Sequence, residues 1–306
     1  MTLSFFISCD KFLEFTITKY EKKEVLTMVE TVYSFSRLDT FNQCEYQYYL
    51  NYVLKVPSPD NIYSVLGTTV HDIFEAMQEG KMTRKEALDK FDTELELYKI
   101  LQFKFMSKQV ETNYVNSINH AIYNFEPIHG DKCEVEKEVF INLDGFKLRG
   151  YIDLITFNSD GSVNIYDFKT STKYSKDDLK KKARQLILYG IAMEQLGYKV
   201  NMIAWDMLKY CTVKGKRGNK TELRGNVDMV TDNQPCFITY PFDNETKQEC
   251  IEWVKSTIRT IELKDALFGE WKTNCESSFF CSNICGYERC DRFKELRKNY
   301  FTNKNS

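Results

Sequence analysis

Between residues 134 and 169 the chain alternates hydrophobic and polar positions with the two-residue period of a β-strand. Two Asp-Gly pairs, Asp144-Gly145 and Asp160-Gly161, interrupt this alternation. Both pairs suit the left-handed backbone of a tight hairpin turn. The pattern therefore predicts at least three consecutive antiparallel strands, of which the last two cover residues 146–157 and 163–169.

The rest of the chain mainly shows helical spacing of its apolar positions. Thr83 and Glu86 form a capping box, which marks the start of a helix. Gly80 follows another apolar stripe and is placed to end that helix. The complete prediction consists of helices over residues 34–52, 67–80, 83–100, 105–125, 175–196 and 244–267, with two further strands over residues 199–213 and 235–240.

Composition limits the function without defining it. The 306-residue chain carries a net charge of −2, so any site for a polyanion must be a local patch. No run approaches the ~18 apolar residues of a membrane span, so we expect no membrane association. Ten cysteines are scattered without a compact disulfide framework, which favours a reducing cytoplasm.

Residues 1–30 lack a clear period, and we interpret them as an N-terminal extension. Three explanations stay open for this stretch: an arm outside the fold, sequence upstream of a start at Met28, or a short element packed on the core. We assign residues 31–295 to one folded domain and residues 296–306 to a C-terminal tail.

Two acidic residues lie within the predicted hairpin. If its turn centres on Asp160, residues whose numbers sum to 320 face each other, which places Asp153 opposite Asp167. Cross-strand β-carbons lie about 4.5–5.5 Å apart, so the two carboxylates converge, and Lys169 shares the face of Asp167. A solvated outer face is one interpretation. However, both acids stand among apolar residues, and buried like charges need a cation between them, for which Mg²⁺ is a typical choice.

Five motifs occur in an order that resembles the RecB-like branch of the PD-(D/E)XK nuclease superfamily. They are Ser34-x-Ser36-x-Leu38-x-x-Phe41-x-x-Cys44, Gly67-x-x-x-His71-x-x-x-Glu75, Gly150-Tyr-Ile-Asp153, Asp167-x-Lys169 and Gln185-Leu-x-x-Tyr189. Each motif alone is weak, but their order and spacing are specific, and the resemblance covers about residues 32–295. It implies an α/β fold of the PD-(D/E)XK (restriction-endonuclease-like) type, a mixed β-sheet flanked by helices and closed by a C-terminal cysteine cluster.

The resemblance also implies roles for these residues. His71, Asp153, Asp167 and the backbone carbonyl of Phe168 would ligate Mg²⁺ or Mn²⁺. Lys169 would orient the attacking water or stabilise the negative charge of the transition state, and Gln185 and Tyr189 would position the lysine and the substrate. Glu75 would be either a neighbour of the metal ligands or an ion on the helix face.

Three cysteines, Cys281, Cys285 and Cys290, lie within ten residues near the C-terminus. Beside turn-forming residues, this density favours thiolate ligation over inert buried thiols. A subset of RecB-like nucleases carries a [4Fe–4S] cluster on one N-terminal and three C-terminal cysteines, and the resemblance places Cys44 as the first ligand. The spacing departs by one residue in each gap, and Cys275 is an alternative to Cys281. We expect a [4Fe–4S] cluster, with a four-thiolate Zn²⁺ site and inert thiols as alternatives.

A basic, glycine-containing loop or hairpin arm contains Lys214, Lys216, Arg217 and Lys220, and we interpret it as a phosphate contact rather than an ordinary solvated loop. We recognise no element for reading base sequence. The sequence therefore predicts a metal-dependent exodeoxyribonuclease that acts on single-stranded DNA or DNA ends in repair, recombination or phage DNA processing, alongside a helicase or recombination partner. Two alternatives stay open: a non-catalytic DNA-end-binding subunit of a helicase–nuclease complex, and a sequence-specific endonuclease.

Overall fold

The computed structural model describes residues 31–171, 174, 176–214, 221–225, 234–287, 290–291 and 294–295. The chain divides into two compact units, Met1–Val32 and Tyr33–Ser306. The second unit contains the helices, nearly all of the sheet and every described residue of the predicted site. In this described part, no helix is both long enough and apolar enough to cross a bilayer.

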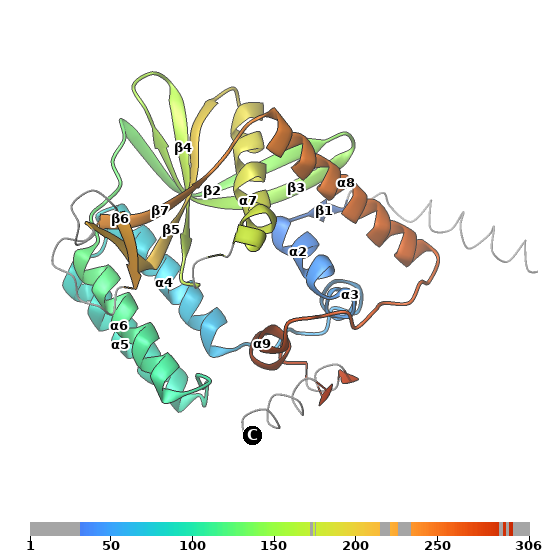
Figure 1. Cartoon of the computed structure of the whole chain (residues 1–306), viewed down its shortest axis with the longest axis horizontal. Helices are drawn as coiled ribbons and strands as arrows, with labels where there is room; N and C mark the ends of the chain where they lie inside the picture. Colours follow the sequence, from blue (N-terminus) through green and yellow to red (C-terminus); the bar gives the residue numbers. More distant parts are fainter. Residues whose placement is uncertain are drawn as a thin grey trace, which may run out of the picture. The chain divides into compact units, whose positions relative to one another are not determined.

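A mixed sheet forms the centre of the second unit (Figure 1). Its strand order is β1-β3-β4-β5-β6, with β2 paired to β3 and β7 paired to β5. The β4–β5 pair is parallel, whereas β2–β3, β3–β4, β5–β6 and β5–β7 are antiparallel. The strands are β1 (Val32–Tyr33), β2 (Lys132–Leu143), β3 (Phe146–Phe157), β4 (Ser162–Lys169), β5 (Lys199–Lys214), β6 (Thr221–Gly225) and β7 (Gln234–Tyr240).

The two predicted Asp-Gly turns join β2 to β3 and β3 to β4. Asp144 (φ 45°), Gly145 (φ 92°) and Gly161 (φ 80°) adopt the left-handed backbone that such turns require. The side chain of Asp160 accepts hydrogen bonds from Ser162 N (3.0 Å) and Oγ (2.6 Å), which holds the second turn. The β3–β4 register pairs Leu154 with Tyr166 and Phe157 with Val163, so the residue numbers sum to 320 as predicted.

Helices cover both faces of this sheet (Figure 1), which confirms the predicted fold class. Residues of α2, α7 and α8 share one core with the sheet, and residues of α4, α5 and α6 share the other. The helical elements are α2 (Phe35–Gln43), α3 (Glu45–Tyr48), the π-helix η1 (Tyr49–Val53), α4 (Ile62–Gln78), α5 (Arg84–Ile100), α6 (Lys108–Asn124), α7 (Lys176–Gln195), α8 (Asn244–Ala266), α9 (Ser278–Phe280) and the π-helix η3 (Cys281–Cys285).

The first predicted helix is wrong at Cys44. The apolar spacing predicts one helix over residues 34–52, but Cys44 adopts an extended backbone (φ −162°, ψ 111°) between α2 and α3. The apolar spacing does not reveal this break, because residues on both sides of it pack in the same core. Leu38 and Phe41 precede the break, and Tyr48 follows it. The break places Cys44 in a separate buried cluster with two C-terminal cysteines.

The alternation of β3 changes face at Asp153. Ile152 packs in the core beneath α7 and α8, Leu154 packs in the core beneath α4–α6, and Ile155 packs in the first core again. On β2, Glu136 would face Asp153, but it is skipped in the strand pairing and has a left-handed φ of 46°. A local backbone irregularity therefore coincides with the first predicted acid.

Candidate active site

Asp153 and Asp167 lie on neighbouring strands, just beyond the paired residues Leu154 and Tyr166. Both carboxylates are buried, with exposed fractions of 7% and 1%. The backbone N–H of Phe168 donates a 2.7 Å hydrogen bond to Asp153 Oδ2, which ties β3 to β4 at this point. The hairpin thus holds two acids close together in a dry environment.

Lys169 is the last residue of β4, and its amine faces these acids. Its Nζ lies 2.6 Å from Asp167 Oδ2. In the described part of the chain, neither oxygen of Asp167 accepts a well-aligned hydrogen bond, so this ion pair is what compensates the buried carboxylate. Burial opposes a charged amine, but Asp167 and Asp153 together raise the pKa of Lys169, which keeps it a cation at neutral pH.

The single positive charge of Lys169 can neutralise only one of the two buried carboxylates. Burial, followed by the charge of Asp167, raises the pKa of Asp153 well above its usual range, and Lys169 only partly offsets this. Among the described residues, no group of three or more His, Cys, Asp and Glu side chains is arranged to hold a metal ion as it stands. The lone pairs of Asp167 that accept no hydrogen bond nevertheless fit a hard divalent cation, which favours oxygen ligands.

His71 reaches the same acids from α4. Its Nδ1 lies 3.4 Å from Asp153 Oδ2, and the imidazole also hydrogen-bonds with the backbone of Phe168. Burial, and then the charge of Lys169, lower the pKa of His71, so the neutral form dominates at neutral pH. A neutral imidazole is the form that ligates metals. The side chain is therefore in the correct state beside the carboxylates for the predicted role.

Gln185 and Tyr189 of α7 hold the lysine from the other side. The amine of Lys169 lies 3.5 Å from Gln185 Oε1, and Gln185 Nε2 donates a 2.9 Å hydrogen bond to Tyr189 Oη. The ring of Tyr189 packs directly on Gly150 of β3, where a β-carbon would lie 2.7 Å from Cε1. Four of the five sequence motifs thus meet in one network.

The contribution of Glu136 was not predicted from the sequence. Burial, followed by a hydrogen bond with Glu136, raises the pKa of Glu75 to about 8. The charge of Glu136 also acts on Asp153. The Asp144-Gly145 turn was the available signal, because the register that it sets places Glu136 opposite Asp153. Glu75 therefore neighbours the acids through Glu136, and it is not an isolated ion on the helix face.

The cysteines form a second site away from these acids. Cys44, Cys275 and Cys281 make one buried cluster. Burial, together with smaller contributions from the nearby Cys44 and Cys290, raises the pKa of Cys285 to about 11, so these thiols also lie near the cluster. The structure thus gathers all five predicted cysteines, including Cys275, which the sequence treats only as an alternative.

Backbone amides favour the thiolate form at two of these positions. Burial raises the pKa of Cys44, but hydrogen bonds from the backbone at Gln47 and Tyr46 lower it. The backbone at Tyr287 lowers the pKa of Cys285 in the same way, although burial dominates. Hydrogen bonds to sulfur also occur in thiolate metal sites, although no three of these described cysteines are arranged to hold an ion as they stand.

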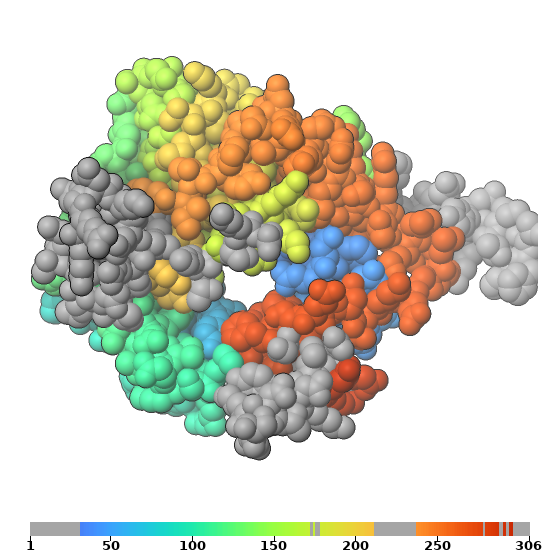
Figure 2. Space-filling view, viewed as in Figure 1, coloured from blue at the N-terminus to red at the C-terminus, as the bar shows by residue number. Residues whose placement is uncertain are grey.

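The C-terminal segment, residues 268–287 after α8, is also anchored by contacts that involve no cysteine side chain. Asn61 Nδ2 donates to Ile284 O (3.2 Å), and Tyr46 N donates to Lys272 O (3.0 Å). Tyr287 donates a hydrogen bond to Asn51. Figure 2 shows this red segment lying against α4 and α6, so it forms a wall of the domain beside both helices.

The predicted basic arm is a hairpin at its base. β5 and β6 pair from Tyr210 with Gly225 to Lys214 with Thr221. Lys214 ends β5, whereas Lys216, Arg217 and Lys220 lie outside the described residues. The hairpin form of the arm is confirmed, and its phosphate contact stays a prediction.

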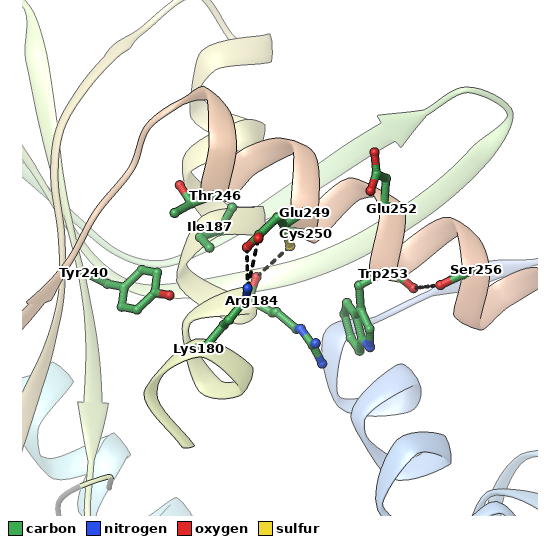
Figure 3. Close-up of a pocket in the computed structure, with 10 residues that line it drawn as sticks. All are labelled: Lys180, Arg184, Ile187, Tyr240, Thr246, Glu249, Cys250, Glu252, Trp253 and Ser256. Carbon is green, nitrogen blue, oxygen red and sulfur yellow. Dashed lines mark hydrogen bonds and ion pairs between the residues drawn. The ribbon is translucent and has the colours of Figure 1, made fainter. Parts of the chain in front are cut away.

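A cavity of about 480 Å³ between α7 and α8 is a separate feature. Figure 3 shows Lys180 paired with Glu249 and the guanidinium of Arg184 directed toward Trp253, whose ring centroid is 4.4 Å away. None of the predicted metal ligands lines it. Because Lys180 and Glu249 neutralise each other and no predicted metal ligand lines the cavity, we assign this cavity no part in the chemistry of Asp153 and Asp167.

The chain is similar in sequence to known proteins. The chain is 25% identical over 261 residues to a subunit of the ATP-dependent helicase/deoxyribonuclease of Streptococcus agalactiae, covering 78% of this chain and 23% of that protein. The Streptococcus mutans counterpart is 30% identical over 166 residues, covering 45% of this chain and 14% of that protein. The chain therefore spans less than a quarter of the length of these relatives.

A crystal structure of a candidate exonuclease from Eubacterium rectale superposes with a TM-score of 0.49 at 14% identity, covering 95% of this chain and 94% of that chain. This likeness is too distant to carry an argument. The family profile of the PD-(D/E)XK nuclease superfamily, by contrast, matches residues 32–290, which include both acids, the lysine and the cysteine cluster. The chain belongs to the PD-(D/E)XK nuclease superfamily.

Proposed function

We propose that this chain is a divalent-metal-dependent deoxyribonuclease that acts as an exonuclease on single-stranded DNA or DNA ends. The observation that carries the proposal is the buried Asp153–Asp167 pair with Lys169 Nζ 2.6 Å from Asp167. Phosphodiester hydrolysis needs oxygens that hold a cation beside a fixed positive charge, and this hairpin supplies both.

His71, Asp153, Asp167 and the carbonyl of Phe168 are the groups that would hold Mg²⁺ or Mn²⁺. When bound, the ion supplies positive charge at the scissile phosphate and lowers the pKa of a bound water. The amine of Lys169 orients that water or stabilises the negative charge that develops on the phosphate oxygens.

Two further side chains direct the amine. Gln185 lies 3.5 Å from Lys169 Nζ, and Tyr189 fixes Gln185 through their 2.9 Å hydrogen bond. The lysine is thereby limited to the space beside Asp167. Such limits matter because a small displacement of a catalytic group costs a large part of the rate.

The Streptococcus relatives support DNA as the substrate and a helicase as a partner, because they are named as subunits of a helicase/deoxyribonuclease. Repair, recombination or phage DNA processing would be the setting for such a complex. The alternative, a non-catalytic end-binding subunit, fits less well, because a binding subunit has no need of His71, both acids and Lys169 in one assembly.

Degradation of single-stranded DNA tests the proposal directly. The protein is incubated with Mg²⁺ or Mn²⁺ and linear DNA labelled at the 5′ or the 3′ end, beside a closed circle of the same sequence. We expect degradation of the linear DNA and survival of the circle, with the first label released giving the polarity. Discrete bands from the circle would favour an endonuclease. Binding without degradation of either DNA would favour the end-binding subunit.

We also propose that Cys44, Cys281, Cys285 and Cys290 hold a [4Fe–4S] cluster, with Cys275 as an alternative ligand and Zn²⁺ as the alternative metal. The gathering of these thiols and the amides beside Cys44 and Cys285 support this. The metal would link the segment after α8 to the α2–α3 break, in a structural role.

A further inference from the structure

A second cavity, of about 570 Å³, opens where β4 ends. Its volume is in the range of roughly 300–1,000 Å³ that is usual for small-molecule sites. Its lining comes from five parts of the chain: α4, α6, the end of β5, the C-terminal segment, and the residues that follow Lys169. None of the proposed metal ligands or cysteine ligands lines it, so it is a separate site.

Aromatic rings and one amine define the chemistry of this cavity. The rings of Tyr63 and Phe279 lie 6.1 Å apart, and Lys209 Nζ lies 5.2 Å from the centroid of Tyr114. Phe279 is 45% exposed, so its ring is available to a ligand. Within the described residues, no carboxylate forms an ion pair with Lys209, and burial lowers its pKa. An amine without an acidic partner beside aromatic faces suits a flat ring system that carries an anion.

The lining of the cavity adjoins the active site in sequence. Thr170 and Ser171 line it and directly follow Lys169, whose amine is proposed to act at the scissile phosphate. Thr170 and Tyr114 both line the cavity, and Thr170 Oγ1 faces Gly67 on the helix that carries His71. A strand whose phosphate lies at Lys169 therefore has a neighbouring nucleotide within reach of the cavity.

We propose that this cavity holds one unpaired nucleobase of the DNA strand being cleaved, stacked on Phe279 with the tilted ring of Tyr63 at its edge, and with an adjoining phosphate at Lys209. The inference rests on the proposed nuclease function and assigns a substrate subsite beside the same active site. A base inside a duplex must first lose its pairing and stacking to enter, so the cavity selects single-stranded or frayed DNA. Stacking is tolerant of sequence, because every base has a π-face.

The test combines a ring deletion with a base deletion. Single-stranded oligonucleotides that each lack one base, at successive positions, are compared on wild type, Phe279→Ala and Phe279→Leu. Tyr123→Ala is the matched control, because Tyr123 is 68% exposed on α6 and does not line the cavity. DNA affinity is measured by fluorescence anisotropy in EDTA, and KM and kcat are measured separately with Mn²⁺.

We expect Phe279→Ala to weaken binding and raise KM by roughly 5- to 100-fold with little change in kcat. Removing the base that enters the cavity should weaken DNA binding by wild type by the same factor. It should not weaken binding by Phe279→Ala any further. Phe279→Leu should behave like the alanine variant, because it keeps apolar bulk but lacks a ring face. Tyr123→Ala should match wild type.

Two results would overturn the inference. In the first, the losses of DNA affinity from the missing base and from Phe279→Ala add at every position of the missing base. In the second, Phe279→Leu binds DNA with the affinity of wild type. Either result, with cleavage by wild type intact, would remove the base site and leave the nuclease proposal standing. If no protein cleaves DNA but anisotropy shows the non-additive effect, the base site stands and the nuclease proposal fails.

Discussion

Gly150 of β3 packs so closely against Tyr189 of α7 that a β-carbon at position 150 would lie 2.7 Å from Tyr189 Cε1. Tyr189 in turn holds Gln185, and Gln185 lies beside the amine of Lys169. A glycine on one strand thereby sets the position of a lysine on the next strand. This close packing explains in physical terms why the Gly-Tyr-Ile-Asp motif begins with glycine.

We predict that Gly150→Ala lowers kcat by roughly 10- to 100-fold, because the displaced Tyr189 moves Gln185 and Lys169. The overpacked ring should also cost about 1–3 kcal/mol of unfolding free energy. Calorimetric Mn²⁺ affinity should stay unchanged, since His71 and the two acids do not move. In a Tyr189→Ala background, Gly150→Ala should not lower kcat any further. An equal additional decrease of kcat in that background would show that the clash with the Tyr189 ring is not the cause.

Asp206 predicts a pH-dependent stability. This β5 residue is 6% exposed, and burial raises its pKa from 3.8 to about 7. The folded state therefore holds the proton more tightly than the unfolded state. The associated stability is fully present below the unfolded pKa and is lost as the pH rises through about 7.

Asp206→Asn removes this titration. Between about pH 4 and pH 8, we expect the wild type to lose up to about 4 kcal/mol relative to the variant, since each unit of pKa shift is worth about 1.4 kcal/mol. Urea unfolding in EDTA at several pH values measures the difference. Parallel stability curves for the two proteins would show that the Asp206 carboxyl is not perturbed in this way.

The proposed role of Cys44 as a ligand leads to a prediction about the metal content of the protein. Anaerobically purified wild type should contain iron with the visible absorbance of a cluster, or else zinc. Cys44→Ser should lose most of that metal and unfold at a lower temperature, because the α2–α3 break is no longer linked to the C-terminal segment. The control is Cys133→Ser, which changes an exposed thiol. A wild type with neither iron nor zinc would contradict the site.

The basic arm predicts the salt dependence of DNA binding. In Lys216→Glu/Arg217→Glu, affinity should fall, and the slope of log affinity against log salt should decrease by about 0.7 for each phosphate of single-stranded DNA that the arm no longer neutralises. The rate at saturating DNA should be unchanged. Lys81→Glu/Lys85→Glu is the matched control, since both of its side chains are largely exposed on other elements. Equal slopes for the two variants would identify the arm as an ordinary solvated loop.

The sequence predicts the hairpin closely because local chemistry determines it. Asp144-Gly145 and Asp160-Gly161 are turns that fix the register of the strands they join, so the positions of Asp153 and Asp167 follow from counting residues. Helix limits such as the Thr83–Glu86 capping box are equally local. Gln185 and Tyr189 stand one turn apart on a periodic helix, and their hydrogen bond follows from that spacing.

The remaining features depend on contacts that are distant in sequence. The break at Cys44 is invisible to apolar spacing, because residues on both sides of it enter the same core. The left-handed backbone of Glu136 is unusual for a residue other than glycine, and nothing in the alternating strand indicates it. The aromatic cavity joins Tyr63, Lys209 and Phe279, which only the completed fold brings together.

Lys169→Met tests whether the hairpin acids and Lys169 form a hydrolytic site. Single-turnover cleavage of end-labelled single-stranded DNA is measured at saturating Mn²⁺ and protein, with Mn²⁺ and DNA affinities determined in parallel. We predict a decrease of at least roughly 100-fold in the cleavage rate with both affinities retained, because the lysine acts on the charge of the transition state. Cleavage by Lys169→Met at the wild-type rate would show that the lysine does not act in the hydrolysis.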